Sequence, residues 1–227
     1  MSQSRLSEIE RGGGSFTAEQ FLLLLRIFNV AASDFVSDPG APELQLQNAL
    51  ARLGASHLQE SAHVLPSKHL EEVHDVVREA LVEGSPRSLT ALAPVLVRHP
   101  ERLRLSALYA ELARLGMERR FVWLIENTLA ALDLFHKEPG TASREWARRD
   151  RMAEVVLQHF LKSIPSSDRG GGLEVAPPHI LDATIRSERT LREVQSAASK
   201  ISQRWGIVTS LQPEDFLQAL KAARASH

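Results

Sequence analysis

Apolar residues recur every three or four positions along almost the whole chain, and this spacing constrains the fold more than any other feature. Such spacing places apolar side chains on one face of an α-helix, whereas a half-buried strand shows strict alternation. No sustained alternation occurs, and β-favouring residues are sparse, with a single tyrosine among 227 residues. We therefore expect an all-α protein of roughly eight to ten helices.

Several apolar stripes mark the expected helices in the middle and C-terminal parts of the chain. They are formed by Leu70, Val73, Val77 and Leu81; by Leu89, Leu92, Ala93 and Leu96; by Leu105, Leu108, Leu112 and Leu115; by Phe121, Leu124, Thr128, Leu132 and Phe135; by Ala153, Val156, Phe160 and Ile164; by Leu191, Val194, Ala198, Ile201 and Trp205; and by Phe216, Leu217 and Leu220. Proline fits the first turn of a helix and glycine its C-terminal end, and both stand at the borders of these stripes. They are Pro86, Pro100 and Pro213, and Gly54, Gly84 and Gly116.

The composition indicates a chain that can bury a core in a reducing compartment. Hydrophobic residues make up 43% and charged residues 24%, values typical of globular domains. The chain has no cysteine, which excludes disulfides, thiolate catalysis and cysteine-ligated zinc or iron–sulfur sites. Its longest apolar runs, such as residues 21–25, fall far short of the roughly 20 residues that a membrane helix needs. We expect a cytoplasmic protein without a membrane partner.

The N-terminal residues carry the most specific pattern in the chain. The string Ser4-Arg5-Leu6-Ser7-Glu8-Ile9-Glu10-Arg11-Gly12 is followed by an expected helix from Thr17 to Phe28. Thr17 and Gln20 form a capping box, in which each side chain satisfies a backbone donor at the start of that helix. This stretch, about residues 1–30, resembles the recognition helix and the following helix of an Xre/Cro-type helix-turn-helix regulator.

The resemblance implies that the N-terminal string reads DNA. A recognition helix enters the major groove by its N-terminal residues, where glutamine can pair with adenine and arginine with guanine or a phosphate. The implied DNA contacts are Ser2, Gln3, Ser4, Arg5, Ser7 and Arg11. Leu6 and Ile9 would anchor the helix to its domain. The alternative is a plain surface helix with these two residues as its apolar side.

The chain departs from this family in one respect. Such a domain normally has two further helices before the recognition helix, and here Met1 almost directly precedes it. Either the start is misassigned or truncated, or a short form exists in which downstream helices or a partner cover Leu6 and Ile9. The net charge of the chain is −1, whereas a free DNA-binding domain usually carries an excess of basic residues. We therefore expect weak or absent autonomous DNA binding from this chain.

Beyond the N-terminal segment, no residue pattern predicts a catalytic or metal site. His57, His63, His69 and His74 are spaced by six, six and five residues, which does not place them on one helical face. The Gly170–Gly172 stretch lacks the lysine of a phosphate-binding loop and fits a linker. Neither a nucleophile elbow nor a dinucleotide loop occurs, so we expect no enzyme activity, metal or cofactor.

Three arginine clusters are further candidate binding elements. They comprise Arg98, Arg102 and Arg104; Arg114, Arg119 and Arg120; and Arg144, Arg148, Arg149 and Arg151. Such clusters can contact phosphate, RNA or an acidic partner. Interspersed acids, among them Glu101, Glu145 and Asp150, favour instead solvated helix faces with ion pairs.

The pattern as a whole favours a DNA-binding regulator, or an antitoxin that neutralises a partner toxin through its helical body. A short Xre-like segment before a long helical remainder resembles antitoxins paired with nucleotidyltransferase-type toxins. Trp123, Trp146 and Trp205 are candidate anchors for such a partner, unless they pack in the core. Two alternatives stay open: a one-component transcription factor whose helical domain dimerises or senses a ligand, and a helical interaction scaffold without DNA binding. A homodimer is compatible with each of them.

Two polar loops divide the chain into three expected segments. Ser33 to Pro42 is rich in Asp, Ser, Pro and Gly, and Ser163 to Pro178 contains the triple glycine and a Pro-Pro pair. The expected segments are a partial helix-turn-helix at 1–32, a central helical bundle at 42–164 and a C-terminal helical pair at 177–227.

Overall fold

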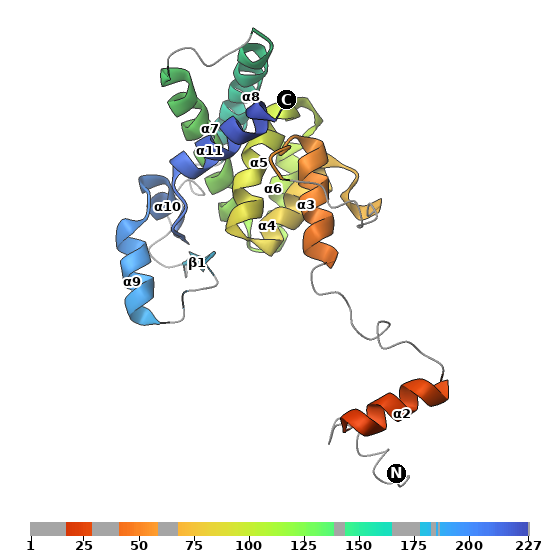
Figure 1. Cartoon of the computed structure of the whole chain (residues 1–227). Helices are drawn as coiled ribbons and strands as arrows, with labels where there is room; N and C mark the ends of the chain where they lie inside the picture. Colours follow the sequence, from red (N-terminus) through yellow and green to blue (C-terminus); the bar gives the residue numbers. More distant parts are fainter. Residues whose placement is uncertain are drawn as a thin grey trace. The chain divides into compact units, whose positions relative to one another are not determined.

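The apolar spacing corresponds to ten α-helices in the described part of the computed structural model (Figure 1). The structure describes residues 17–28, 41–58, 68–138, 144–164, 178–182, 185 and 187–226. Within these residues the only strands are β1 (His179–Ile180) and β2 (Ile207–Val208), which form a short parallel pair. The prediction of an all-α fold is confirmed. The chain divides into two compact units, Met1–Pro42 and Glu43–His227.

In the first unit, the described residues form one helix, α2 (Ala18–Phe28). The expected capping box is present: the Thr17 amide donates to Gln20 Oε1 and the Gln20 amide donates to Thr17 Oγ1, each at 3.3 Å. The helix that was predicted from Thr17 to Phe28 is therefore confirmed. The DNA contacts implied by the resemblance lie outside the described residues; they are Ser2, Gln3, Ser4, Arg5, Ser7 and Arg11.

Six helices, α3 to α8, build the N-terminal half of the second unit. They are α3 (Ala41–Leu53), α4 (Val73–Glu83), α5 (Pro86–Arg98), α6 (Leu105–Arg114), α7 (Glu118–Lys137) and α8 (Arg144–Ser163), with the 3₁₀ turns η2 (Lys68–Leu70) and η3 (Pro100–Arg102). Several boundaries are those that the sequence predicts: Pro86 and Pro100 open α5 and η3, and Gly84, at φ +74°, ends α4. In the part of the chain that is described, none of the helices has the length and apolarity to cross a membrane.

Helix α7 lies at the centre of the core, because it contacts α5, α6, α8, α10 and α11. Its side chains Phe121, Trp123 and Leu124 have no exposed surface. Burial of an apolar side chain of this size contributes about 1.5–3 kcal/mol relative to an exposed position. The long stripe on α7 therefore supplies a large share of the apolar contacts in the second unit.

Three helices follow in the C-terminal segment: α9 (Glu188–Ala197), α10 (Lys200–Trp205) and α11 (Pro213–Ala225). Helices α10 and α11 share the core of the bundle. The Phe216 ring meets the Trp123 ring edge-on at 5.5 Å, and Trp123 Nε1 donates to Ser202 Oγ at 2.9 Å. The residues expected as a separate C-terminal segment thus belong to the same unit as the central bundle, because α10 and α11 supply part of its core.

The single stripe expected from Leu191 to Trp205 is divided between two helices. Ser199 has an extended backbone, and its hydroxyl accepts a hydrogen bond from the Ser202 amide at 3.0 Å. A serine that caps a new helix ends the preceding one, so capping overrides the apolar spacing here. No residue of α9 is buried, whereas α10, the other half of the stripe, buries Ser202 and Trp205.

Candidate functional site

The fold brings two of the arginine clusters together at one cleft. This cleft, of about 570 Å³, lies between the N-terminal half of α8 and the corner where α5 passes into η3. Arg98 comes from the first cluster in the sequence, and Arg148 and Arg149 come from the third. We call this site the cationic cleft, and its lining residues are Arg98, His99, Pro100, Glu101, Glu145, Arg148, Arg149 and Met152.

Backbone geometry places Arg98 at the wall of the cationic cleft. Helix α5 ends at Arg98, and Pro100 starts η3 two residues later, because proline cannot continue the hydrogen bonding of the preceding helix. Gly54, at φ +132°, lies directly against the Arg98 side chain: a Cβ at Gly54 would lie 2.9 Å from Arg98 Cδ. Position 54 therefore requires glycine for two reasons: its backbone conformation is one that other residues rarely adopt, and a side chain there would collide with Arg98.

The cleft has an excess of positive charge. Three arginines and two glutamates line it, and Arg149 Nη2 donates to Glu145 Oε1 at 2.9 Å. Burial lowers the pKa of His99, and the neighbouring charges of Arg102 and Arg98 lower it further. His99 is therefore neutral at about pH 7. An anionic group from a ligand is the chemistry that this cleft favours.

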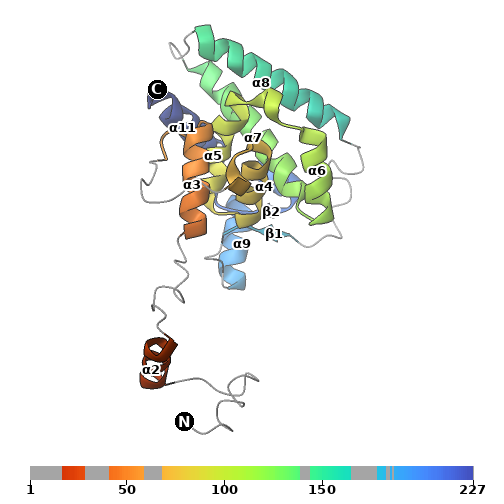
Figure 2. The same cartoon turned by 90° about the vertical axis from the view of Figure 1, so that its right-hand side faces the viewer.

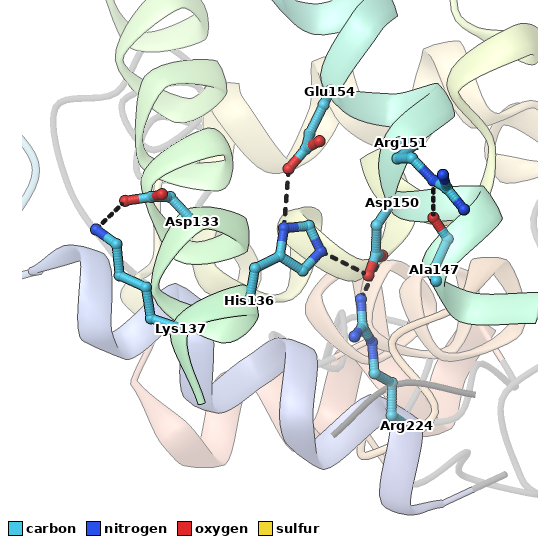
Figure 3. Close-up of polar contacts among 8 residues, drawn as sticks. All are labelled: Asp133, His136, Lys137, Ala147, Asp150, Arg151, Glu154 and Arg224. Carbon is cyan, nitrogen blue, oxygen red and sulfur yellow. Dashed lines mark hydrogen bonds and ion pairs between the residues drawn. The ribbon is translucent and has the colours of Figure 1, made fainter. Parts of the chain in front are cut away.

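A buried carboxylate fixes α8 to the rest of the unit (Figure 3). Asp150 has no exposed side-chain surface, and Arg224 Nη2 of α11 donates to Asp150 Oδ1 at 2.5 Å. His136 of α7 lies between two carboxylates of α8, with Nε2 3.3 Å from Asp150 Oδ2 and Nδ1 3.2 Å from Glu154 Oε1. These four side chains link α7, α8 and α11, and we call them the Asp150 clamp.

Aromatic rings enclose the cation of the Asp150 clamp. The Arg224 guanidinium lies 4.0 Å from the centroid of the Phe135 ring and 5.0 Å from that of Trp146. Burial lowers the pKa of Arg224, and Asp150 opposes this shift. Arg149 lies 5.7 Å from the same Trp146 ring. One tryptophan thus contacts both the clamp and a lining residue of the cationic cleft, so the clamp supports the cleft wall.

The Asp150 clamp is built as a structural contact. Both ring nitrogens of His136 face carboxylates of α8, those of Asp150 and Glu154, so the imidazole bridges α7 and α8. Among the described residues, no group of three or more histidine, aspartate or glutamate side chains is arranged to hold a metal ion. What the clamp does is hold three helices together.

The remaining candidates from the sequence are dispersed. His74 Nε2 lies 3.1 Å from a glutamate oxygen of α6, and His63 lies outside the described residues. Trp123 and Trp205 are buried in the core, so they pack inside the unit and do not present a surface anchor. Trp146 is half-buried beside the clamp. Among the described residues, the first and third arginine clusters meet at the cationic cleft.

Comparisons with protein-family models, with curated proteins and with solved structures find no match to this chain. No relative therefore assigns a role to the cationic cleft. Sequence reasoning had missed His99 and the Asp150 clamp. The available signal was Asp150 itself, an acid three residues before the buried Ala153 on the inward stripe of α8.

We expect Asp150→Ala to lower the free energy of unfolding by about 3–5 kcal/mol, because it leaves the Arg224 charge without its carboxylate. Urea unfolding followed by circular dichroism measures this change. The double variant Asp150→Ala with Arg224→Met removes both charges, and its loss should be smaller than the sum of the two single losses. Additive losses would show that the two side chains do not form a clamp.

We also expect the free energy of unfolding to fall as the pH is lowered from about 7 to about 5. Burial lowers the pKa of His57, His99 and His179 in the folded chain, so the unfolded chain binds more protons in this range. This stabilisation is present above the ordinary histidine pKa of about 6.5 and is lost as the pH falls below it. His99→Gln should flatten the dependence in unfolding curves recorded at several pH values. An unchanged slope would mean that the fold does not hold His99 neutral.

Proposed function

We propose that this chain is a cytoplasmic regulator of the antitoxin type, whose helical body binds and neutralises a partner toxin and whose segment 1–32 reads DNA. The body supplies the surface for the partner, and the cationic cleft is the part of that surface that contacts it. The resemblance of the N-terminal string to an Xre/Cro-type recognition helix supports the DNA-reading half of the proposal.

The cationic cleft is the observation that carries this proposal. Sites for small molecules are mostly apolar and enclose their ligand, whereas this cleft is open and lined by charged residues from α5, η3 and α8. Arg148 is exposed, so an acidic segment of another protein can reach it. Complementary charge of this kind accelerates association and selects the partner.

Complementary charge also gives a mechanism for neutralisation. A nucleotidyltransferase-type toxin, the partner class suggested by the outline of the sequence, transfers a group that carries phosphate. Sites for such transfers hold Mg²⁺ with carboxylates. Arginines placed over these carboxylates would exclude the metal and the nucleotide. Occlusion of this kind needs exposed positive charge at the contact surface, and the exposed Arg148 supports this mechanism.

We expect the product of the co-transcribed neighbouring gene to inhibit growth when expressed alone, and to co-purify with this chain when both are expressed. The double variant Arg98→Glu with Arg148→Glu should weaken the complex by about tenfold or more and reduce the rescue of growth. Arg189→Glu, on α9 with a 90% exposed side chain, is the matched control and should change neither result. A neighbour that never binds the wild-type chain would refute the antitoxin function.

We expect weak DNA binding from the 227-residue chain and stronger, salt-sensitive binding when an in-frame extension supplies two preceding helices. Mobility shifts with the DNA upstream of the gene measure both forms. In the extended form, Gln3→Ala and Arg5→Ala should remove the preference for that sequence over unrelated DNA. Tight, specific binding by the shorter chain would contradict the first expectation, and an extended form without sequence preference would contradict the DNA-reading role.

A further inference from the structure

A second, mostly apolar depression lies beside the same helix, α8. This second depression, of about 400 Å³, lies between the C-terminal half of α8 and the start of α6. Leu103, Leu105 and Ser106 line one side, and the residues of α8 that line the other side include the exposed Val155 and the polar His159 and Ser163. Figure 2 shows α8 at the edge of the second unit, with α6 below its C-terminal half. Both depressions therefore open along the same helix.

The residues that α8 contributes to the two depressions lie on one helical face. Arg148, Met152 and Val155 follow one another at intervals of four and three residues, which is the spacing of one face of an α-helix. From Glu145 to Ser163, the first and last of these lining residues, the face is about 27 Å long. That length suits a partner helix of about five turns.

This face exposes apolar side chains that the attachment of α8 does not require. Val155 is 65% exposed and Met152 is 50% exposed. Helix α8 already buries Ala153, Leu157 and Phe160 against the core. One apolar stripe is enough to attach a helix to its core. Within the described part of the chain, Met152 and Val155 are therefore exposed beyond what the attachment of α8 needs.

We propose that the α8 groove, meaning the cationic cleft and the apolar depression together, binds an amphipathic helix of the partner protein. The partner helix carries acidic side chains where it meets Arg98 and Arg148. It carries aliphatic side chains where it meets Val155 and Leu105. A helix that is bound in a groove presents its own anchors at spacings of three and four residues, so these acidic and aliphatic side chains lie on one face of the partner helix. The inference rests on the proposed function in one respect, namely that the partner is a protein.

Other occupants match the groove less well. A phosphate backbone needs cations along its length, whereas the apolar half of the groove has none of the arginines and the cationic half contains Glu101 and Glu145. A second copy of the chain has the wrong charges. An antiparallel pair of α8 helices would set Arg148 against His159 and Lys162, and a parallel pair would set Arg148 against its own counterpart.

The probe for this proposal is a fluorescein-labelled synthetic helix of about 18 residues. One face of the peptide carries glutamates in its first half and leucines in its second half. We expect fluorescence anisotropy to show saturable binding to the full chain, which weakens in high salt because part of the attraction is electrostatic. A peptide of the same composition, with these residues scattered around the helix, should not bind. Equal binding of the two peptides would overturn the proposal.

Substitutions in the two halves of the groove test whether the acidic half of the peptide lies at Arg148 and its aliphatic half at Val155. Arg148→Glu should weaken binding about tenfold, and a peptide with lysine in place of glutamate should restore the affinity. Val155→Asp should weaken the binding of both peptides, because it places a charge on the apolar half. Arg189→Glu and Val82→Asp change an exposed arginine and an exposed valine outside the groove, and should have no effect. Affinity that is unchanged by both groove substitutions would refute the proposal.

The outcomes separate the groove from the antitoxin function. If the neighbouring gene product binds wild-type chain, Arg148→Glu and Val155→Asp equally well, the groove and the contact through the cationic cleft are wrong, whereas neutralisation of a partner through another surface stands. If that product does not bind but the peptide does, the antitoxin function is wrong and the groove stands. Competition by a single-stranded oligonucleotide that is insensitive to Val155→Asp would assign this face to nucleic acid and overturn the proposal.

Discussion

The arrangement of the helices depends on the buried charge of Asp150. An ionised carboxylate without exposed surface costs several kcal/mol unless a cation and hydrogen bonds compensate it. Arg224 supplies that cation from α11, 74 residues further along the chain, and His136 supplies a second contact from α7. Because these two partners come from other helices, the buried charge of Asp150 links the position of α8 to the positions of α7 and α11.

The same constraint decides which side of α8 faces solvent. Asp150 and Leu157 are fully buried, and the helical period of 3.6 residues then turns Arg148 and Val155 away from the core. The Asp150 clamp and the α8 groove are therefore two sides of one helix. Trp146 joins them, because its ring contacts one arginine of the clamp and one of the cationic cleft.

The helices could be predicted from the sequence because their signals are local. Pro86 marks a helix start through its restricted backbone, and Ser199 is an equally local signal that the apolar stripe around it conceals. The cationic cleft could not be predicted, since tertiary packing alone brings Arg98 next to Arg148. An acid on a buried stripe, such as Asp150, signals that a cation must meet it, but the stripe does not identify which one. The implied DNA contacts lie outside the described residues and stay a prediction.

The contrast between α8 and α9 distinguishes a binding face from an ordinary solvated one. Helix α9 buries none of its residues and covers its surface with ion pairs one turn apart, such as Arg189 with Glu193. Opposite charges that are mixed in this way satisfy one another and offer a partner little to recognise. On α8 the charge and the apolar surface are separated instead, with Arg148 in one half of the groove and Val155 in the other. A single exposed apolar residue is ordinary on any protein surface. A binding face that is cationic in one half and apolar in the other, in contrast, favours a partner whose acidic and apolar side chains follow in the same order.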